Sequence, residues 1–103
     1  MTEELTDAAL LDQVVRVPDH VVHRAFVAET VVLNLQTGRY HGLNPTAGRM
    51  LEVLEATGSV RTAAATIADE YGEPAERVEE DLIVLCRSLL ERRLIELTGA
   101  TPG

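Results

Sequence analysis

Apolar residues recur with two different spacings along the 103-residue chain. In its first part they form short runs rich in Val and Leu, at 14–17, 21–27, 30–35 and 39–43. Runs of this length, separated by turn residues, are typical of β-strands. The last two runs flank a Gln-Thr-Gly turn, which is the clearest β-hairpin signal in the chain. The pattern predicts about three strands in an antiparallel meander.

After the hairpin, apolar residues lie three and four positions apart, which is the period of an amphipathic helix. Asn44 and Pro45 predict the start of a first helix that runs to about residue 57, because Asn caps helices and Pro suits their first turn. Gly58 and Gly72 are natural stops, so a second helix is expected before Gly72 and a third over about 74–93. The side chains expected to face the core are Ala47, Met50, Leu51, Val53 and Leu54 in the first helix, Ala63, Ala64, Ile67, Ala68 and Tyr71 in the second, and Val78, Leu82, Leu85, Cys86 and Leu89 in the third.

The third helix carries more apolar residues than one core face requires, since Ile83, Val84 and Leu90 lie outside its inner stripe. Strands followed by three helices indicate one α+β domain over residues 14–97, with the parts of a winged helix-turn-helix. Residues 1–13 are acidic and are expected to form a flexible N-terminal arm, and residues 98–103 a frayed tail. The segment between, 94–97, is expected to add a last short strand or a capping tail.

Composition narrows the range of partners. Acidic residues outnumber basic ones by 17 to 9, and the resulting net charge of −8 disfavours binding to nucleic acid. A single cysteine excludes an internal disulfide. The N-terminus lacks the basic start and apolar run of a signal peptide, and no window is apolar enough to span a membrane, so we expect a cytoplasmic protein without a membrane partner.

Few residues could carry catalysis. The chain has three His and one Cys, with no metal-ligand spacing and no phosphate-binding loop, so we predict neither an enzyme nor a cofactor or metal. A dyad of His41 and Cys86 is conceivable, but Cys86 lies on the inner stripe of the third helix and is better interpreted as a small buried hydrophobe. A DNA-binding regulator is an alternative, disfavoured because the first half of the third helix carries mostly Glu and Asp.

Peptide binding needs no catalytic residue. The run 39–43 would be the last strand of the meander, and an edge strand can accept another strand through main-chain hydrogen bonds. Side chains alternate along a strand, so either Tyr40 or His41 lines any groove beside the third helix, and the extra apolar residues of that helix could form the other wall. Alternatively, Tyr40 merely covers the sheet and Val84 is an ordinary exposed apolar residue. From the residues alone, the peptide-binding groove and the ordinary exposed surface are about equally supported.

Between residues 21 and 97 the chain carries an ordered set of motifs. They are VVLNLQTGRYHGLNPTAGRML at 31–51, the stop at Gly58, AAATIADEYG at 63–72, and a third helix that leads into LLERRLIEL at 89–97. In this order they resemble a PqqD-like domain, the recognition element for precursors of ribosomally synthesised and post-translationally modified peptides (RiPPs). The chain departs from the family at Arg93, where Gly often precedes the final apolar pair. Within the family, LNPTAGRML and the Ala-rich second helix are most similar to the stand-alone leader-binding protein of lasso-peptide biosynthesis.

The resemblance implies a protein that is not an enzyme and uses no cofactor. It implies that the chain binds the leader region of a precursor peptide as an added antiparallel strand. The leader would then be presented to a leader-cleaving cysteine protease and a macrolactam cyclase in lasso-peptide maturation. A PqqD-type chaperone that presents its precursor to a radical-SAM enzyme is the alternative. The expected peptide-binding residues are Arg39, Tyr40, His41, Gly42 and Leu43 on the strand, and Val78, Asp81, Leu82, Val84 and Leu85 on the third helix, with Val84 included for its place outside the inner stripe.

Overall fold

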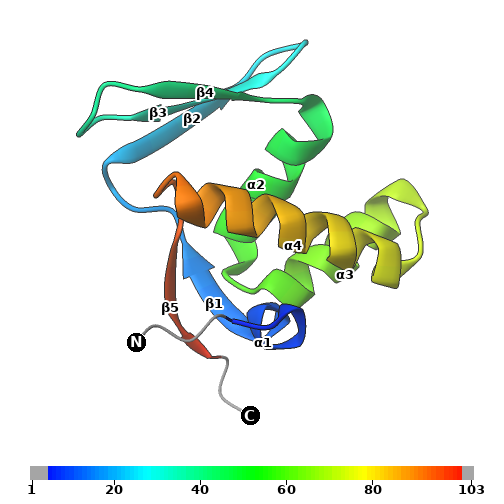
Figure 1. Cartoon of the computed structure of the whole chain (residues 1–103). Helices are drawn as coiled ribbons and strands as arrows, with labels where there is room; N and C mark the ends of the chain where they lie inside the picture. Colours follow the sequence, from blue (N-terminus) through cyan, green and yellow to red (C-terminus); the bar gives the residue numbers. More distant parts are fainter. Residues whose placement is uncertain (1–4, 101–103) are drawn as a thin grey trace.

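The computed structural model describes residues 5–100 and has the predicted α+β architecture (Figure 1). A three-stranded sheet lies on one side of the longest helix, and a separate two-stranded sheet lies on the other. In chain order the elements are α1 (Asp7–Leu11), β1 (Gln13–Arg16), β2 (Val21–Ala25), β3 (Thr30–Asn34), β4 (Tyr40–Leu43), α2 (Pro45–Thr57), α3 (Val60–Tyr71), α4 (Ala75–Glu91) and β5 (Glu96–Ala100). No helix within the described residues has the length and apolar character needed to cross a membrane.

The larger sheet is the predicted meander, with β2, β3 and β4 antiparallel and in that order. Its central strand alternates strictly between a buried and a partly exposed side. Thr30, Val32 and Asn34 lie on the buried side, with exposed fractions of 6% or less. The interior strand of the hairpin is therefore half buried, and the other half of its side chains faces away from the core.

The turn between β3 and β4 is built around the side chain of Asn34. Its Oδ1 accepts hydrogen bonds from the backbone N–H groups of Gln36 at 2.9 Å and Thr37 at 3.3 Å, which is a common role of Asn in turns. Gly38 has a φ of 75°, a conformation that favours glycine, and its N–H donates to the Asn34 carbonyl at 2.8 Å. These contacts hold the short strand β4 in register with β3.

The helices begin and end close to the predicted residues because the local signals are strong. The Oδ1 atom of Asn44 accepts from the Ala47 N–H at 2.8 Å and caps α2. Gly58 and Gly72 end α2 and α3 with φ values of 70° and 67°. Ser59 caps α3 by accepting from the Thr62 N–H at 3.1 Å.

Two predicted helix positions are wrong in their facing. Tyr71, expected to face inward, is 44% exposed at the end of α3. Ile83, expected outside the inner stripe of α4, is buried, and Leu85, expected within it, is partly buried and packs against the core. The cause is that α4 packs against α3 and also against α1, so its buried face is wider and rotated from the stripe read off the sequence.

The first predicted strand joins a second sheet that the sequence pattern did not show. β1 pairs antiparallel with the C-terminal strand β5, with Arg16 opposite Glu96 and Gln13 opposite Ala100. The side chains of Arg16 and Glu96 form an ion pair at 2.5 Å. The expectation of a frayed tail is therefore wrong for residues 98–100, which belong to β5, and its remainder lies outside the described residues.

The N-terminal arm is also ordered where the structure describes it. Thr6 caps α1 by accepting from the Ala9 N–H at 3.1 Å, and Leu10 and Leu11 are buried in the core. Arg87 of α4 donates to the Leu5 carbonyl at 2.8 Å, which fastens the start of the arm. A flexible arm over residues 5–13 is thus incorrect because the two leucines anchor α1; residues 1–4 lie outside the described part.

One close contact sets the distance between α2 and the larger sheet. Gly48 lies in the first half of α2 and is buried against Thr30 of β3. A Cβ atom at position 48 would overlap the Oγ1 and Cβ atoms of Thr30. Glycine therefore allows the helix backbone to approach the strand directly.

Candidate peptide-binding site

The outer edge of β4 is unpaired within the described residues, because β4 bonds only to β3. The Asn34 N–H donates to the Arg39 carbonyl at 2.9 Å, which sets the phase of the ladder between the two strands. In an antiparallel pair, hydrogen-bonded and non-bonded positions alternate. The backbone N–H and C=O groups of Tyr40 and Gly42 therefore point away from β3, toward the open edge.

An apolar hollow of about 360 Å³ lies between α4 and the start of α2, where Asn44 directly follows β4. We call this space the apolar hollow. It is lined by the start of α2 and by one face of α4: Asn44, Thr46, Ala47, Met50, Asp81, Val84, Leu85 and Ser88. Val84 is 69% exposed there, so an apolar side chain is available for contact without any rearrangement of the core.

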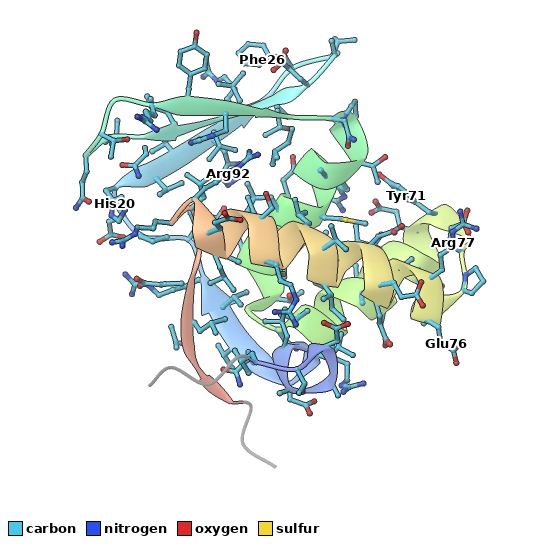
Figure 2. The ribbon with its side chains drawn as sticks, viewed as in Figure 1. His20, Phe26, Tyr71, Glu76, Arg77 and Arg92 are labelled. Atoms are coloured by element: carbon cyan, nitrogen blue, oxygen red, sulfur yellow. The ribbon has the colours of Figure 1, made fainter. Side chains whose placement is uncertain are left out.

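A second hollow, of about 760 Å³, continues from the first toward the β3–β4 turn. We call it the basic hollow because three arginines line it. Its lining residues are Asn34, Thr37, Arg39, His41, Ser88, Glu91, Arg92 and Arg93. Ser88 lines both hollows, so together they form one groove between β4 and α4. Figure 2 shows Arg92 at the end of α4 that lies beneath the three-stranded sheet.

The structure brings five of the ten predicted site residues into this groove. Arg39 and His41 line the basic hollow, and Asp81, Val84 and Leu85 line the apolar hollow. The alternation along β4 resolves the choice between its two neighbouring side chains, since His41 lies opposite the buried Val32.

The other five predicted residues lie elsewhere. Tyr40 is 75% exposed and lies opposite Leu33, on the face of the sheet turned away from the helices. Gly42 shares that face, where Glu29 lies over it, and only its backbone reaches the edge. Leu43, Val78 and Leu82 are buried in the core and present no free side-chain surface, so Val78 and Leu82 support the wall from within.

Sequence reasoning missed the α2 side of the groove and its basic end. Ser88 could have been found, because it lies one helical turn beyond Val84 and Leu85 on the same face of α4. Met50 was assigned to the core, and it is 5% exposed at the floor of the apolar hollow. Nothing in the sequence indicated that the start of α2 would meet α4.

The thiol considered for a catalytic dyad is inaccessible. Cys86 is completely buried, and this burial raises the pKa of its thiol to about 12. The thiol is therefore protonated at neutral pH and does not reach the hollow that His41 lines. A neutral, buried thiol is a structural residue rather than a nucleophile.

Comparisons with known proteins place this groove in context. The family described as coenzyme PQQ synthesis protein D (PqqD) matches residues 29–95. No curated protein sequence matches the chain. A solved structure of TbiB1 in complex with the TbiA(β) leader peptide is 32% identical, with a TM-score of 0.70 over 84% of this chain and 99% of that one.

Two further solved structures share the fold at lower identity. Lasso peptide synthetase B1 complexed with the leader peptide is 24% identical, with a TM-score of 0.69 over 80% of this chain and 96% of that one. The PqqD truncation of Methylobacterium extorquens PqqCD, a stand-alone RiPP recognition element, is 23% identical, with a TM-score of 0.67 over 81% and 88%. Because the family model spans more than half of the sequence and the TbiB1 likeness, at 32% identity, covers 84% of this chain and 99% of that one, this chain belongs to the PqqD family.

Proposed function

We propose that this chain binds the leader region of a ribosomally synthesised precursor peptide by adding the leader as an antiparallel strand to β4. The observation that carries the proposal is the unpaired edge of β4 facing an open groove on α4. The 32% identical structure of TbiB1, which holds a leader peptide, supports it. The chain would act as a non-catalytic adaptor that presents the leader to a leader-cleaving cysteine protease and a macrolactam cyclase in lasso-peptide maturation.

The strand edge alone would not hold a leader. Tyr40 and Gly42 offer roughly four main-chain hydrogen bonds, each worth a net of about 1 kcal/mol. A disordered leader loses about 1–2 kcal/mol of backbone entropy for each residue that becomes ordered. This entropic cost offsets the free energy gained from the main-chain hydrogen bonds. Apolar contacts with Val84 and Leu85 in the apolar hollow are the additional source of affinity.

The sheet has a second edge, on β2, that is also unpaired among the described residues. On the helix-facing side of β2, the Nε2 atom of His23 lies 3.0 Å from Oε1 of Glu55 on α2. A hollow of about 320 Å³ does line β2, but it lies over Val22, Arg24 and Phe26 on the outer face of the sheet, and no helix residue forms a wall there. We infer that β4 is the functional edge for this reason.

A titration of the ¹⁵N-labelled protein tests the proposal, with a synthetic leader whose sequence is taken from a precursor gene identified near the gene for this chain. We expect backbone amide shifts at Tyr40 and Gly42, with accompanying shifts at Val84 and Leu85. The outward-facing amides of His23 and Ala25 on β2 serve as the internal control. Shifts at the β2 positions in place of the β4 positions, or no binding, would reject the proposal.

The name of the matching family favours a second candidate, a PqqD-type chaperone that presents its precursor to a radical-SAM enzyme. Both candidates use the same edge and groove, so the titration does not separate them. The neighbouring genes do: a protease gene with an asparagine-synthetase-like cyclase gene indicates lasso-peptide maturation, and a radical-SAM gene indicates the alternative.

A further inference from the structure

The arginines of this chain fall into two groups. Four of the nine, Arg16, Arg49, Arg61 and Arg87, form ion pairs with carboxylates. The other five have no carboxylate partner within 4.0 Å among the described residues, and three of them line the basic hollow: Arg39, Arg92 and Arg93. In a protein with a net charge of −8, three arginines without carboxylate partners around one hollow are unexpected and point to a binding role.

The three arginines come from both walls of the groove. Arg39 precedes β4, whereas Arg92 and Arg93 follow α4. The helix dipole favours cations at the C-terminal end of a helix, and this accounts in part for Arg92 and Arg93. The helix dipole does not account for Arg39 on the opposite wall, and the single acidic side chain lining the hollow, Glu91, leaves an excess of positive charge.

The backbone at Arg93 is a second observation. Its φ is 59°, in the left-handed region that favours glycine, yet the position holds a long cationic side chain. The turn there is well bonded, since the Arg93 N–H donates to Leu90 at 3.0 Å and the Leu94 N–H to Leu89 at 2.8 Å. The turn thus aims a charged residue at the hollow, at a position where glycine would be less strained.

We propose that the basic hollow binds an acidic side chain of the leader and so fixes its register on β4. This rests on the proposed function, because it requires a strand on that edge. An antiparallel partner runs from the Leu43 end toward the Tyr40 end of β4, so its C-terminal part reaches the basic hollow. Side chains alternate along a strand. If leader residue n lies opposite His41, residues n+2 and n+4 face this hollow, and Asp or Glu belongs there.

An acidic leader residue that fixes the register, which we call the acidic key, has a clear physical role. A slip of one residue would turn every leader side chain to the wrong face. Four outward main-chain groups on β4 bond equally well in several registers, and an acid that meets Arg39 and Arg92 in one register only removes that degeneracy. The negative charge of the rest of the protein repels an acidic leader residue elsewhere, so binding at the basic hollow is favoured over binding at other surfaces.

The test compares Arg39→Gln/Arg92→Gln with Arg24→Gln/Arg77→Gln by calorimetric titration of the synthetic leader at two salt concentrations. Both double variants remove two unpaired positive charges, but Arg24 and Arg77 lie outside the groove. We expect the first to weaken binding roughly 3- to 10-fold and to flatten its salt dependence. The second should stay within about twofold of wild type, since remote charges are screened. Replacing the leader acid by its amide should weaken wild-type binding equally and have no further effect on the Arg39→Gln/Arg92→Gln variant.

The two proposals fail in distinguishable ways. If the leader binds, with shifts at Tyr40 and Gly42, but both double variants bind it alike, the acidic key is overturned and strand addition stands. A leader with no Asp or Glu after its pairing segment overturns the key in the same way. If the wild-type protein does not bind the leader at all, both proposals fall. Equal thermal midpoints for the two variants would confirm that lost affinity is not lost folding.

Discussion

Val84 offers the sharpest test of the groove, because it is prominent on the wall and unimportant to the core. It is 69% exposed on the face of α4 that lines the apolar hollow, and Asp81 lies one turn before it. Changing an exposed helix residue alters the free energy of unfolding by about 0.5 kcal/mol or less. Substitutions at Val84 should therefore change leader affinity and leave thermal stability nearly unchanged.

The expected loss follows from the surface available for burial. Complete burial of a valine side chain is worth about 1.5–3 kcal/mol, and about two thirds of Val84 is open to contact, which corresponds to about 1–2 kcal/mol. Val84→Ala should therefore weaken leader binding roughly 5-fold or more. Val84→Asp adds the desolvation of a charge, about 1–3 kcal/mol, and repulsion from Asp81, so a loss of at least roughly 30-fold is expected.

Calorimetric titration with the synthetic leader measures the affinity, and circular dichroism melting measures the stability. Val27→Asp is the matched control, because Val27 is fully exposed in the β2–β3 turn and the charge change is identical. Wild-type affinity in Val84→Asp, or an equal loss in Val27→Asp, would refute the assignment of this wall.

Three further predictions concern the framework behind the groove. Gly48→Ala should lower the free energy of unfolding by about 1–3 kcal/mol in urea titrations, because the new methyl group overlaps Thr30 and outweighs the helix preference for Ala; an unchanged midpoint would contradict this. Asn34→Ala should cost about 1–2 kcal/mol and speed hydrogen exchange at the Gln36 amide, which loses its acceptor; unaltered exchange would show that the turn forms without it. Because burial raises the pKa of Cys86 from 9.0 to about 12, the unfolded thiol ionises first, so the contribution of this thiol to stability should be constant below pH 9 and be lost from about pH 9 to 12. Urea titrations across that range should show the slope in wild type and a smaller one in Cys86→Ala.

The sequence predicted those parts of the fold whose signals are local. The hairpin turn, the cap at Asn44 and the stop at Gly58 each depend on residues within four positions, and all three lie where expected. The pairing of β1 with β5 joins residues eighty or more positions apart in the sequence, and no local pattern records it. The same limit explains why a flexible arm was expected where α1 lies, because its two buried leucines are held by helices distant in the sequence.

The candidate site shows a similar division. Alternation along β4 limited the groove-facing side chain to Tyr40 or His41, but the choice depended on which face the helices cover. The surplus of apolar residues on α4 directed attention to Val84, which is exposed and lines the apolar hollow. The basic hollow was not foreseen, since its arginines come from the two ends of separate elements, and only the folded chain brings Arg39 beside Arg92.

The β1–β5 ribbon has a consequence for protein engineering and for domain architecture. It holds Gln13 and Ala100 opposite each other, so the chain enters β1 next to the point where β5 ends. Figure 1 places this ribbon on the far side of α4 from the three-stranded sheet. A partner enzyme fused at either end, or a host protein carrying the whole domain as an insertion, would therefore leave the β4–α4 groove open.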